Sequence, residues 1–138
     1  MTTSAQSLSK RLKPENFCRE DGDAHETAKK FLEKHKVAQI RKVFGVLKEI
    51  HRELRGSNKS DKIPAEVKNR LLLVVPQLAY AYGRDLIPKE FYAEMKGYLS
   101  DDSLVTVEDF EVLVEYLTAV LAYQKMQEVE EKKKGQSQ

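Results

Sequence analysis

The feature that most constrains the fold is an apolar segment near the C-terminus. Its apolar residues are spread around the whole helical repeat: Phe110, Val112, Leu113, Val114, Tyr116, Leu117, Ala119, Val120, Leu121 and Ala122. A helix that is apolar on nearly every side must be covered on most of them. We expect a fifth helix from a capping box at Thr106 and Asp109 to about Gln127. This helix is either the centre of a bundle or the seam of a self-association, and the sequence leaves both open.

The other apolar residues also follow the 3.6-residue helical period, and no segment alternates with a period of two. The pattern predicts four earlier helices, over residues 24–35, 37–54, 64–83 and 88–99. Pro76 lies inside the third, so we expect a kink or break near Leu72 to Val75, and Gly83 suits a left-handed C-terminal cap. The predicted fold class is all-α, a single compact bundle of about five helices with a kinked third helix.

Composition divides the chain into three parts. Residues 1–23 hold few apolar side chains, and we expect a mobile N-terminal segment outside the core. Residues 24–127 form the helical bundle domain, and residues 128–138 form a charged C-terminal tail expected to fray. No apolar run approaches the roughly 20 residues that span a bilayer, and the N-terminus has no apolar signal segment. We therefore expect a cytoplasmic protein without a membrane partner.

Residue patterns that carry catalysis or bind metal are missing from the sequence. His25, His35 and His51 lack the i, i+4 spacing that places two imidazoles on one helical face. The single cysteine, Cys18, can form neither an internal disulfide nor a zinc site, and we expect an inert reduced thiol. No nucleophile pairs with a base, and no glycine-rich phosphate loop occurs. We therefore expect no catalytic residue, no metal and no cofactor, and predict that the chain is not an enzyme.

Charge is distributed unevenly along the chain, although the net charge is only +2. Residues 29–70 hold thirteen basic and five acidic residues, whereas residues 85–138 hold six basic and twelve acidic residues. A polar molecule with one face toward an anion would show this division. An ordinary solvated helical surface would show it equally well, so charge alone does not decide.

The second predicted helix carries a row of cations interrupted by a glycine. Arg41, Lys48, Arg52 and Arg55 share one face opposite the apolar stripe, and Gly45 lies in the same row. A glycine costs a helix about 1 kcal/mol relative to alanine. In return it allows close approach, either of a phosphate chain or of another helix.

Further cations surround this row: Lys36, Lys42, Lys59, Lys62, Lys68 and Arg70. Such a patch attracts phosphates through charge and counterion release without reading bases. Tyr80, Tyr82, Tyr92 and Tyr98 could stack on bases, but at helical spacing beside Leu and Ala we expect them in the core.

Three segments resemble the small helical subunit of the type III-A CRISPR–Cas effector complex, the Csm complex. They are residues 31–44, which include FLEKHKV and QIRKVF, residues 75–84 (VPQLAYAYGR) and residues 121–125 (LAYQK). Their order and spacing agree over about residues 28–126. The middle segment is the most specific, because a proline within a helix followed by Leu-Ala-Tyr and a Gly-Arg stop is unusual. The chain departs from the family pattern at Gln77, where a basic residue is expected, and at Val37-Ala38, where Thr or Ser often caps the helix.

The resemblance implies a helical bundle present in several copies beside the subunits that carry the guide crRNA. It implies non-specific contact with guide and target RNA, self-association and assembly with other subunits, which hold the catalytic activities. By analogy, Arg41, Lys42, Arg84 and Lys125 contact RNA. The full candidate RNA-binding set is Lys36, Arg41, Lys42, Gly45, Lys48, Arg52, Arg55, Arg84 and Lys125. The alternative is a helical protein–protein adaptor with an incidental basic face.

Overall fold

The computed structural model describes residues 6–31 and 34–136, with the backbone alone at residues 34–36, 135 and 136. Within these residues the chain forms eight α-helices, and its only β-type pairing is one isolated bridge between Lys62 and Thr106. The helices are α1 (Leu8–Arg11), α2 (Pro14–Phe17), α3 (Asp23–Ala28), α4 (Lys34–Glu53), α5 (Ala65–Leu72), α6 (Val74–Gly83), α7 (Lys89–Tyr98) and α8 (Val107–Gln136). The all-α prediction is confirmed, whereas the predicted number of about five helices is not.

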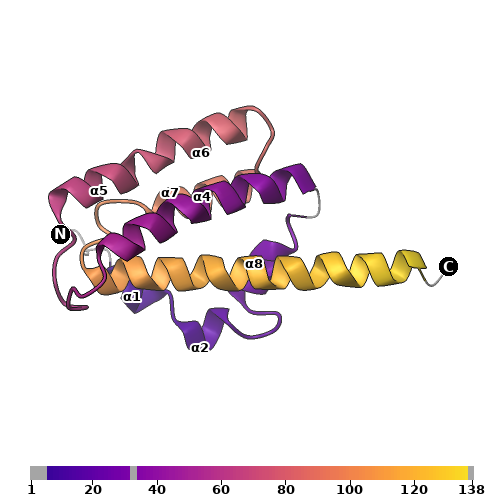
Figure 1. The fold of residues 1–138 in the computed structure, drawn as a ribbon, viewed down its shortest axis with the longest axis horizontal. Helices are drawn as coiled ribbons and strands as arrows, with labels where there is room; N and C mark the ends of the chain where they lie inside the picture. The colour runs from indigo at the N-terminus through magenta and orange to yellow at the C-terminus, as the bar shows by residue number, and fades with distance from the viewer. Residues whose placement is uncertain (1–5, 32–33, 137–138) are drawn as a thin grey trace.

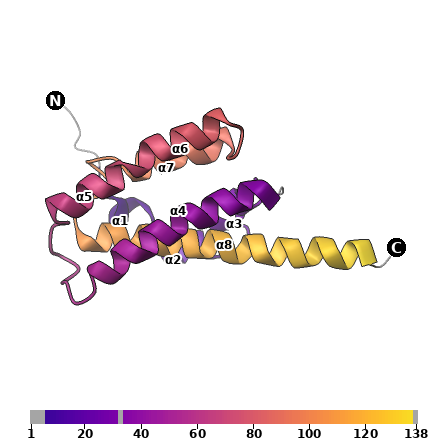
Figure 2. The same ribbon diagram turned by 45° about the horizontal axis from the view of Figure 1, so that its top comes forward.

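The long helix α8 is the centre around which the others pack (Figure 1). Helices α1, α2 and α3 contact it, and so does α4. Figure 2 shows α5 and α6 on the other side of α4 from α8, and α6 packs against α7. Phe110, Leu113, Tyr116, Leu117 and Val120 on α8 are fully buried. Of the two alternatives left by the sequence, the structure therefore supports a central helix covered by its own chain.

The N-terminal segment contributes to this cover, so the expectation that it lies outside the core is wrong. Leu8, Leu12 and Phe17 are buried, and the Phe17 ring meets the Tyr116 ring edge-on at 5.4 Å between centroids. The Leu8 N–H donates a hydrogen bond to the Ser103 carbonyl at 2.8 Å. Helices α1 and α2 are single turns with very few apolar residues, which is too few for periodicity to identify.

Several predicted helix boundaries also need correction. The first predicted helix ends at Ala28 rather than near His35, and α4 begins at Lys34. Helix α8 continues to Gln136 instead of ending near Gln127. The segment expected to fray is thus helical as far as Gln136, although residues 129–134 are exposed.

Two helices divided at Leu73, α5 and α6, replace the single kinked third helix. The physical cause is Pro76, which has no N–H to donate to the Leu72 carbonyl and whose ring crowds that carbonyl. Gly83 is the last residue of α6 and does not form the predicted left-handed cap. Asp85 has the positive φ instead, at 58°. Asp can occupy this region because its short polar side chain bonds locally.

The predicted capping box at the start of α8 is present. The Thr106 N–H donates to Asp109 Oδ2 at 2.9 Å, and the Asp109 N–H donates to Thr106 Oγ1 at 3.4 Å. Asp109 is fully buried and also accepts the N–H groups of Ser9, at 2.8 Å, and Val105, at 3.0 Å. Burial by itself raises the pKa of Asp109, but these hydrogen bonds outweigh it and hold the pKa below its ordinary value. One carboxylate therefore joins α1 to the start of α8.

A second buried polar cluster joins α3, α7 and α8. The Tyr116 hydroxyl donates to Glu94 and lies 2.6 Å from Thr27 Oγ1. Burial raises the pKa of Glu94, and the hydrogen bond from Tyr116 only partly offsets this rise. Burial and the nearby Glu94 carboxylate raise the pKa of Tyr116 as well.

We predict that Asp109→Ala lowers the free energy of unfolding by roughly 2–4 kcal/mol near neutral pH, because it leaves three backbone N–H groups without their charged acceptor. A carboxyl with a lowered folded-state pKa contributes stability above its unfolded pKa, about 3.9, and loses it as the pH falls through the folded value. The difference between variant and parent should therefore shrink below about pH 4. Urea unfolding measured from pH 7 to pH 3 tests this, with exposed Asp102→Ala as the matched control. A pH-independent deficit would contradict the assignment.

Candidate nucleic-acid interface

The outward face of α4 carries most of the candidate set. Ile40, Val43, Leu47 and Ile50 face the core, which leaves the opposite side of the helix to solvent. Arg41, Lys42, Gly45 and Arg52 are exposed there, and Arg55 is exposed in the turn that follows α4. We call Arg41, Gly45, Lys48, Arg52 and Arg55 the α4 row. Lys48 is half-buried, with its ammonium 5.9 Å from the centre of the Phe44 ring.

Gly45 leaves the backbone of α4 open in the middle of this row. A Cβ placed on Gly45 would have no atom within 4 Å, apart from neighbouring atoms of its own helix. The alternative of a helix–helix contact through Gly45 is therefore not realised within the described part of the chain. Any group that makes close contact with the backbone at Gly45 must therefore belong to another molecule.

Acidic residues also lie on this face, and the sequence analysis did not weigh them. Glu49 is exposed one turn beyond Gly45, and Glu53 pairs with Arg70 at 2.7 Å. Lys68 similarly pairs with Asp101 at 3.0 Å. Because these carboxylates offset nearby cations, the strongly positive surface is limited to the α4 row and the residues next to it.

The remaining candidates fall on two different sides of α4. Lys42 and Arg84 line a groove of about 650 Å³ between α4 and α6, which we call the α4/α6 groove. Arg41 instead lines a second groove, between α4 and α8, together with Glu128. Lys125 pairs with that same Glu128 at 3.6 Å. The backbone of Lys36 belongs to α4, but its side chain lies outside the described residues.

An exposed aromatic ring lies beside the α4/α6 groove, so the prediction that the tyrosines are core is wrong for Tyr80 and Tyr82, whereas Tyr92 and Tyr98 are half-buried against the core. Tyr80 is 66% exposed, and the Arg84 guanidinium lies 5.7 Å from the centre of its ring. Arg84 also donates to the Tyr80 hydroxyl at 3.2 Å. Tyr82 is exposed too and stacks on the half-buried Tyr92 at 5.4 Å. The sequence signal was available, since Tyr80 is out of phase with the buried Val74, Leu78 and Ala81 on α6.

Groups suited to catalysis do not gather elsewhere in the described residues. No group of three or more His, Cys, Asp or Glu residues there could hold a metal ion, and no described helix is long and apolar enough to cross a membrane. Burial and the Glu115 carboxylate raise the pKa of the Cys18 thiol, which disfavours the reactive thiolate. The His25 ring stacks on Tyr123 at 4.4 Å, and its Nδ1 accepts the Asp21 N–H. The exposed cations of α4 are thus suited to electrostatic binding.

The model of the Csm2 Type III-A family matches residues 15–130, most of the chain and all helices from α3 to α7. The chain belongs to this family. It is accordingly a structural subunit of the type III-A CRISPR effector complex, which assembles with the other subunits of that complex. Neither a curated protein nor a solved structure matches the chain. The family match confirms the resemblance that three segments of the sequence indicate.

We predict that Gly45→Ala raises the free energy of unfolding by up to about 1 kcal/mol, because alanine favours the helix and its Cβ meets open space. Thermal and urea unfolding of the purified chain measure the change. Gly56→Ala is the contrasting variant: Gly56 has a φ of +92°, so an alanine there is strained and should destabilise the protein. A loss of stability on Gly45→Ala would mean that the face is covered after all.

Proposed function

We propose that this subunit binds guide and target RNA through the sugar–phosphate backbone, without reading sequence, and supplies no catalytic group. The observation that carries this proposal is the open backbone at Gly45 among the exposed cations of α4. The proposed RNA-binding residues are Lys36, Arg41, Lys42, Gly45, Lys48, Arg52, Arg55, Arg84 and Lys125. The proposal has the chain act within antiviral defence as a scaffold for RNA whose cleavage is performed by other subunits.

The chemistry of the α4 row favours a phosphate chain over other anions. Arg41 precedes Gly45 along α4, and Lys48 and Arg52 follow it. Their donors flank the uncovered backbone at Gly45, so a narrow, extended anion can lie against the helix there. Binding of this kind derives mostly from counterion release and carries no base information.

The α4/α6 groove extends this surface and gives it a preference for unpaired bases. Lys42 and Arg84 line the groove, and Tyr80 presents an exposed ring at its edge. Stacking of a base on an aromatic ring contributes about 1–3 kcal/mol and tolerates any sequence. The tyrosine thus adds affinity for any unpaired nucleotide beside the duplex.

We predict that the triple variant Arg41→Ala, Lys48→Ala, Arg52→Ala binds RNA more weakly by a similar factor for unrelated sequences. Each lost phosphate contact flattens the slope of log affinity against log salt by roughly 0.7 for a single strand or 0.9 for a duplex. The triple variant should therefore lose on the order of two units if all three residues touch RNA. Fluorescence anisotropy at several salt concentrations measures both quantities. A loss that depends on sequence would indicate base readout and contradict the proposal.

Two further variants serve as controls on the same helix. Glu49→Gln removes a carboxylate one turn from Gly45, so RNA affinity should rise. Gly45→Leu should keep the helix but obstruct the phosphate chain, giving a folded protein that binds RNA less well. Normal RNA binding by Gly45→Leu would remove the α4 row from the proposal.

We also propose that several copies of the chain associate with one another through α5 and α6. Leu73 is 63% exposed and Leu72 is exposed beside it, whereas most apolar residues of α8 are buried. Exposed apolar residues of this size favour a protein partner. In the alternative function as a protein–protein adaptor, a partner protein binds this apolar surface alone. Such binding persists in high salt, whereas RNA binding weakens. A cytoplasmic location remains a prediction.

We predict that Leu73→Ser weakens self-association while changing the free energy of unfolding by less than about 0.5 kcal/mol, because the side chain is largely exposed. Sedimentation velocity over a range of protein concentrations measures the association. Val129→Ser, at an exposed apolar residue on α8, is the matched control and should leave association unchanged. A parent chain that stays strictly monomeric at high concentration would count against the proposal.

A further inference from the structure

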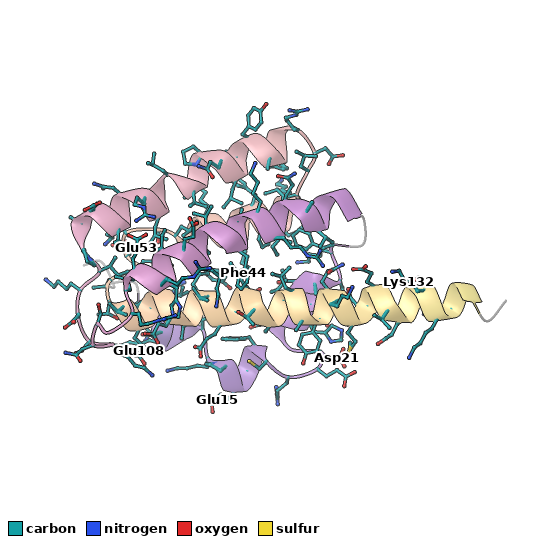
Figure 3. The ribbon with its side chains drawn as sticks, in the orientation of Figure 1. Glu15, Asp21, Phe44, Glu53, Glu108 and Lys132 are labelled. Carbon is teal, nitrogen blue, oxygen red and sulfur yellow. The ribbon has the colours of Figure 1, made fainter. Side chains whose placement is uncertain are left out.

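A second groove lies where α8 runs past the start of α4. It has a volume of about 460 Å³ and is separate from the α4/α6 groove. Phe31, Val37 and Ala38 line its apolar side. In Figures 1 and 2 the C-terminal part of α8 extends beyond the rest of the bundle, so a partner can approach this side. Figure 3 shows Lys132 on this projecting part of α8.

The polar side of the groove contains two amide oxygens that lack a hydrogen-bond donor. Gln124 is only 6% exposed, and its Oε1 has no partner. The Oε1 of Gln127, the next groove residue along α8, is equally buried and has no partner. Burying a carbonyl oxygen without a donor is costly, so such pairs are rare in folded proteins.

The orientation of the Gln124 amide follows from its neighbour. The Gln124 side chain lies beside the Glu128 carboxylate, and a carboxylate accepts hydrogen bonds only. The amide nitrogen therefore faces Glu128, and the carbonyl oxygen is the atom left without a donor. An exchange of the nitrogen and oxygen positions would set two acceptors against each other, so it does not remove the unpaired oxygen.

Four residues on this face of α8 carry hydrogen-bond acceptors, and Lys132 adds a cation. Gln124, Gln127, Glu128 and Glu131 recur at i, i+3, i+4 and i+7, so they lie on one side of the helix. Lys125, Lys132 and Arg41 lie near Glu128, and the last two also line the groove, whereas neither amide oxygen has a hydrogen-bond partner. The groove thus offers apolar contact along one side and unused acceptors along the other.

We propose that this groove binds an arginine side chain presented by a neighbouring protein subunit. An arginine has an apolar stem that packs on Phe31 and Val37, and a guanidinium with five N–H donors for both amide oxygens. Lysine matches less well, because its compact ammonium is strongly hydrated and lacks the planar fork. A phosphate has no donor for the amide oxygens, and the two cations that line the groove, Arg41 and Lys132, are balanced by Glu128 and Glu131.

The test uses the full chain with the tripeptide N-acetyl-Gly-Arg-Gly-amide as the probe. Nuclear magnetic resonance should show saturable shifts of the Gln124 and Gln127 side-chain amide signals. The tripeptide with norleucine in place of arginine has the apolar stem without the donors, and it should give shifts at least tenfold smaller at equal concentration. Inorganic phosphate and a short single-stranded RNA are titrated in parallel.

Two variants separate binding from folding. Gln124→Met keeps the length of the side chain but removes the unpaired oxygen, so it should raise the midpoint of thermal unfolding and weaken arginine-peptide binding at least tenfold. Lys96→Met, at an exposed residue on α7 away from the groove, should change neither result.

The possible outcomes decide the proposal. Saturable arginine-specific shifts that are lost in Gln124→Met support it. Equal binding of the norleucine peptide would indicate a purely apolar groove and overturn it. Shifts of these amides with phosphate or RNA but not with the arginine peptide would assign the groove to nucleic acid and overturn it as well, as would no shift with any probe.

Discussion

The whole arrangement depends on covering α8, whose apolar residues point in nearly every direction. Each fully buried Leu, Val or Phe contributes roughly 1.5–3 kcal/mol, so leaving one side of this helix open would cost several such contributions. Four elements meet the requirement: α1, α2 and α3, together with α4. Helix α4 has one apolar face, and the core uses all of it. Its opposite face is therefore left to solvent, and the charges there are free for a function.

Buried polar contacts specify how the covering helices sit on α8, and two of them respond oppositely to pH. Asp109 has a lowered pKa, so its contribution to stability is present above its unfolded pKa and is lost in acid. Glu94 has a raised pKa, so its contribution is fully present below its unfolded pKa and is lost as the pH rises through the folded value. Both groups lie against α8, one at its start and one beside Tyr116. Because the first loss occurs below about pH 4 and the second above it, the two contacts together stabilise the packing on α8 most near that pH.

The sequence predicted those elements whose signal is local and failed where tertiary packing decides. The apolar stripe of α4, the capping box of α8 and the interruption caused by Pro76 all follow from residues within one or two turns. Helices α1 and α2 could not be predicted, because a single Leu or Phe in one turn gains its burial only from α8 being nearby. By contrast, the exposure of Tyr80 could have been predicted, because Tyr80 is out of phase with the buried residues of α6.

The same distinction applies to the candidate RNA interface. Spacing alone placed Arg41 and Arg52 on one face of α4, and both are exposed there. Spacing could not show that Arg41 and Lys42 line different grooves, because that depends on which helices flank α4. The acidic neighbour Glu49 was visible in the sequence and was overlooked. Counting acidic as well as basic residues on each helical face would have included Glu49.

Consecutive residues on a helix point about 100° apart, and α4 uses this to separate two kinds of partner. Lys42 points toward α6, where Arg84 adds positive charge and no acidic residue lines the groove. Arg41 lies nearer to α8, where Glu128 and Glu131 also line the groove, although its side chain is exposed on the α4 row. In the RNA-binding mode that we propose, a strand on the α4 row therefore lies toward α6, where cations line the groove without carboxylates. The α8 side, where Glu128 and Glu131 line the groove, is the side that we propose for a protein neighbour.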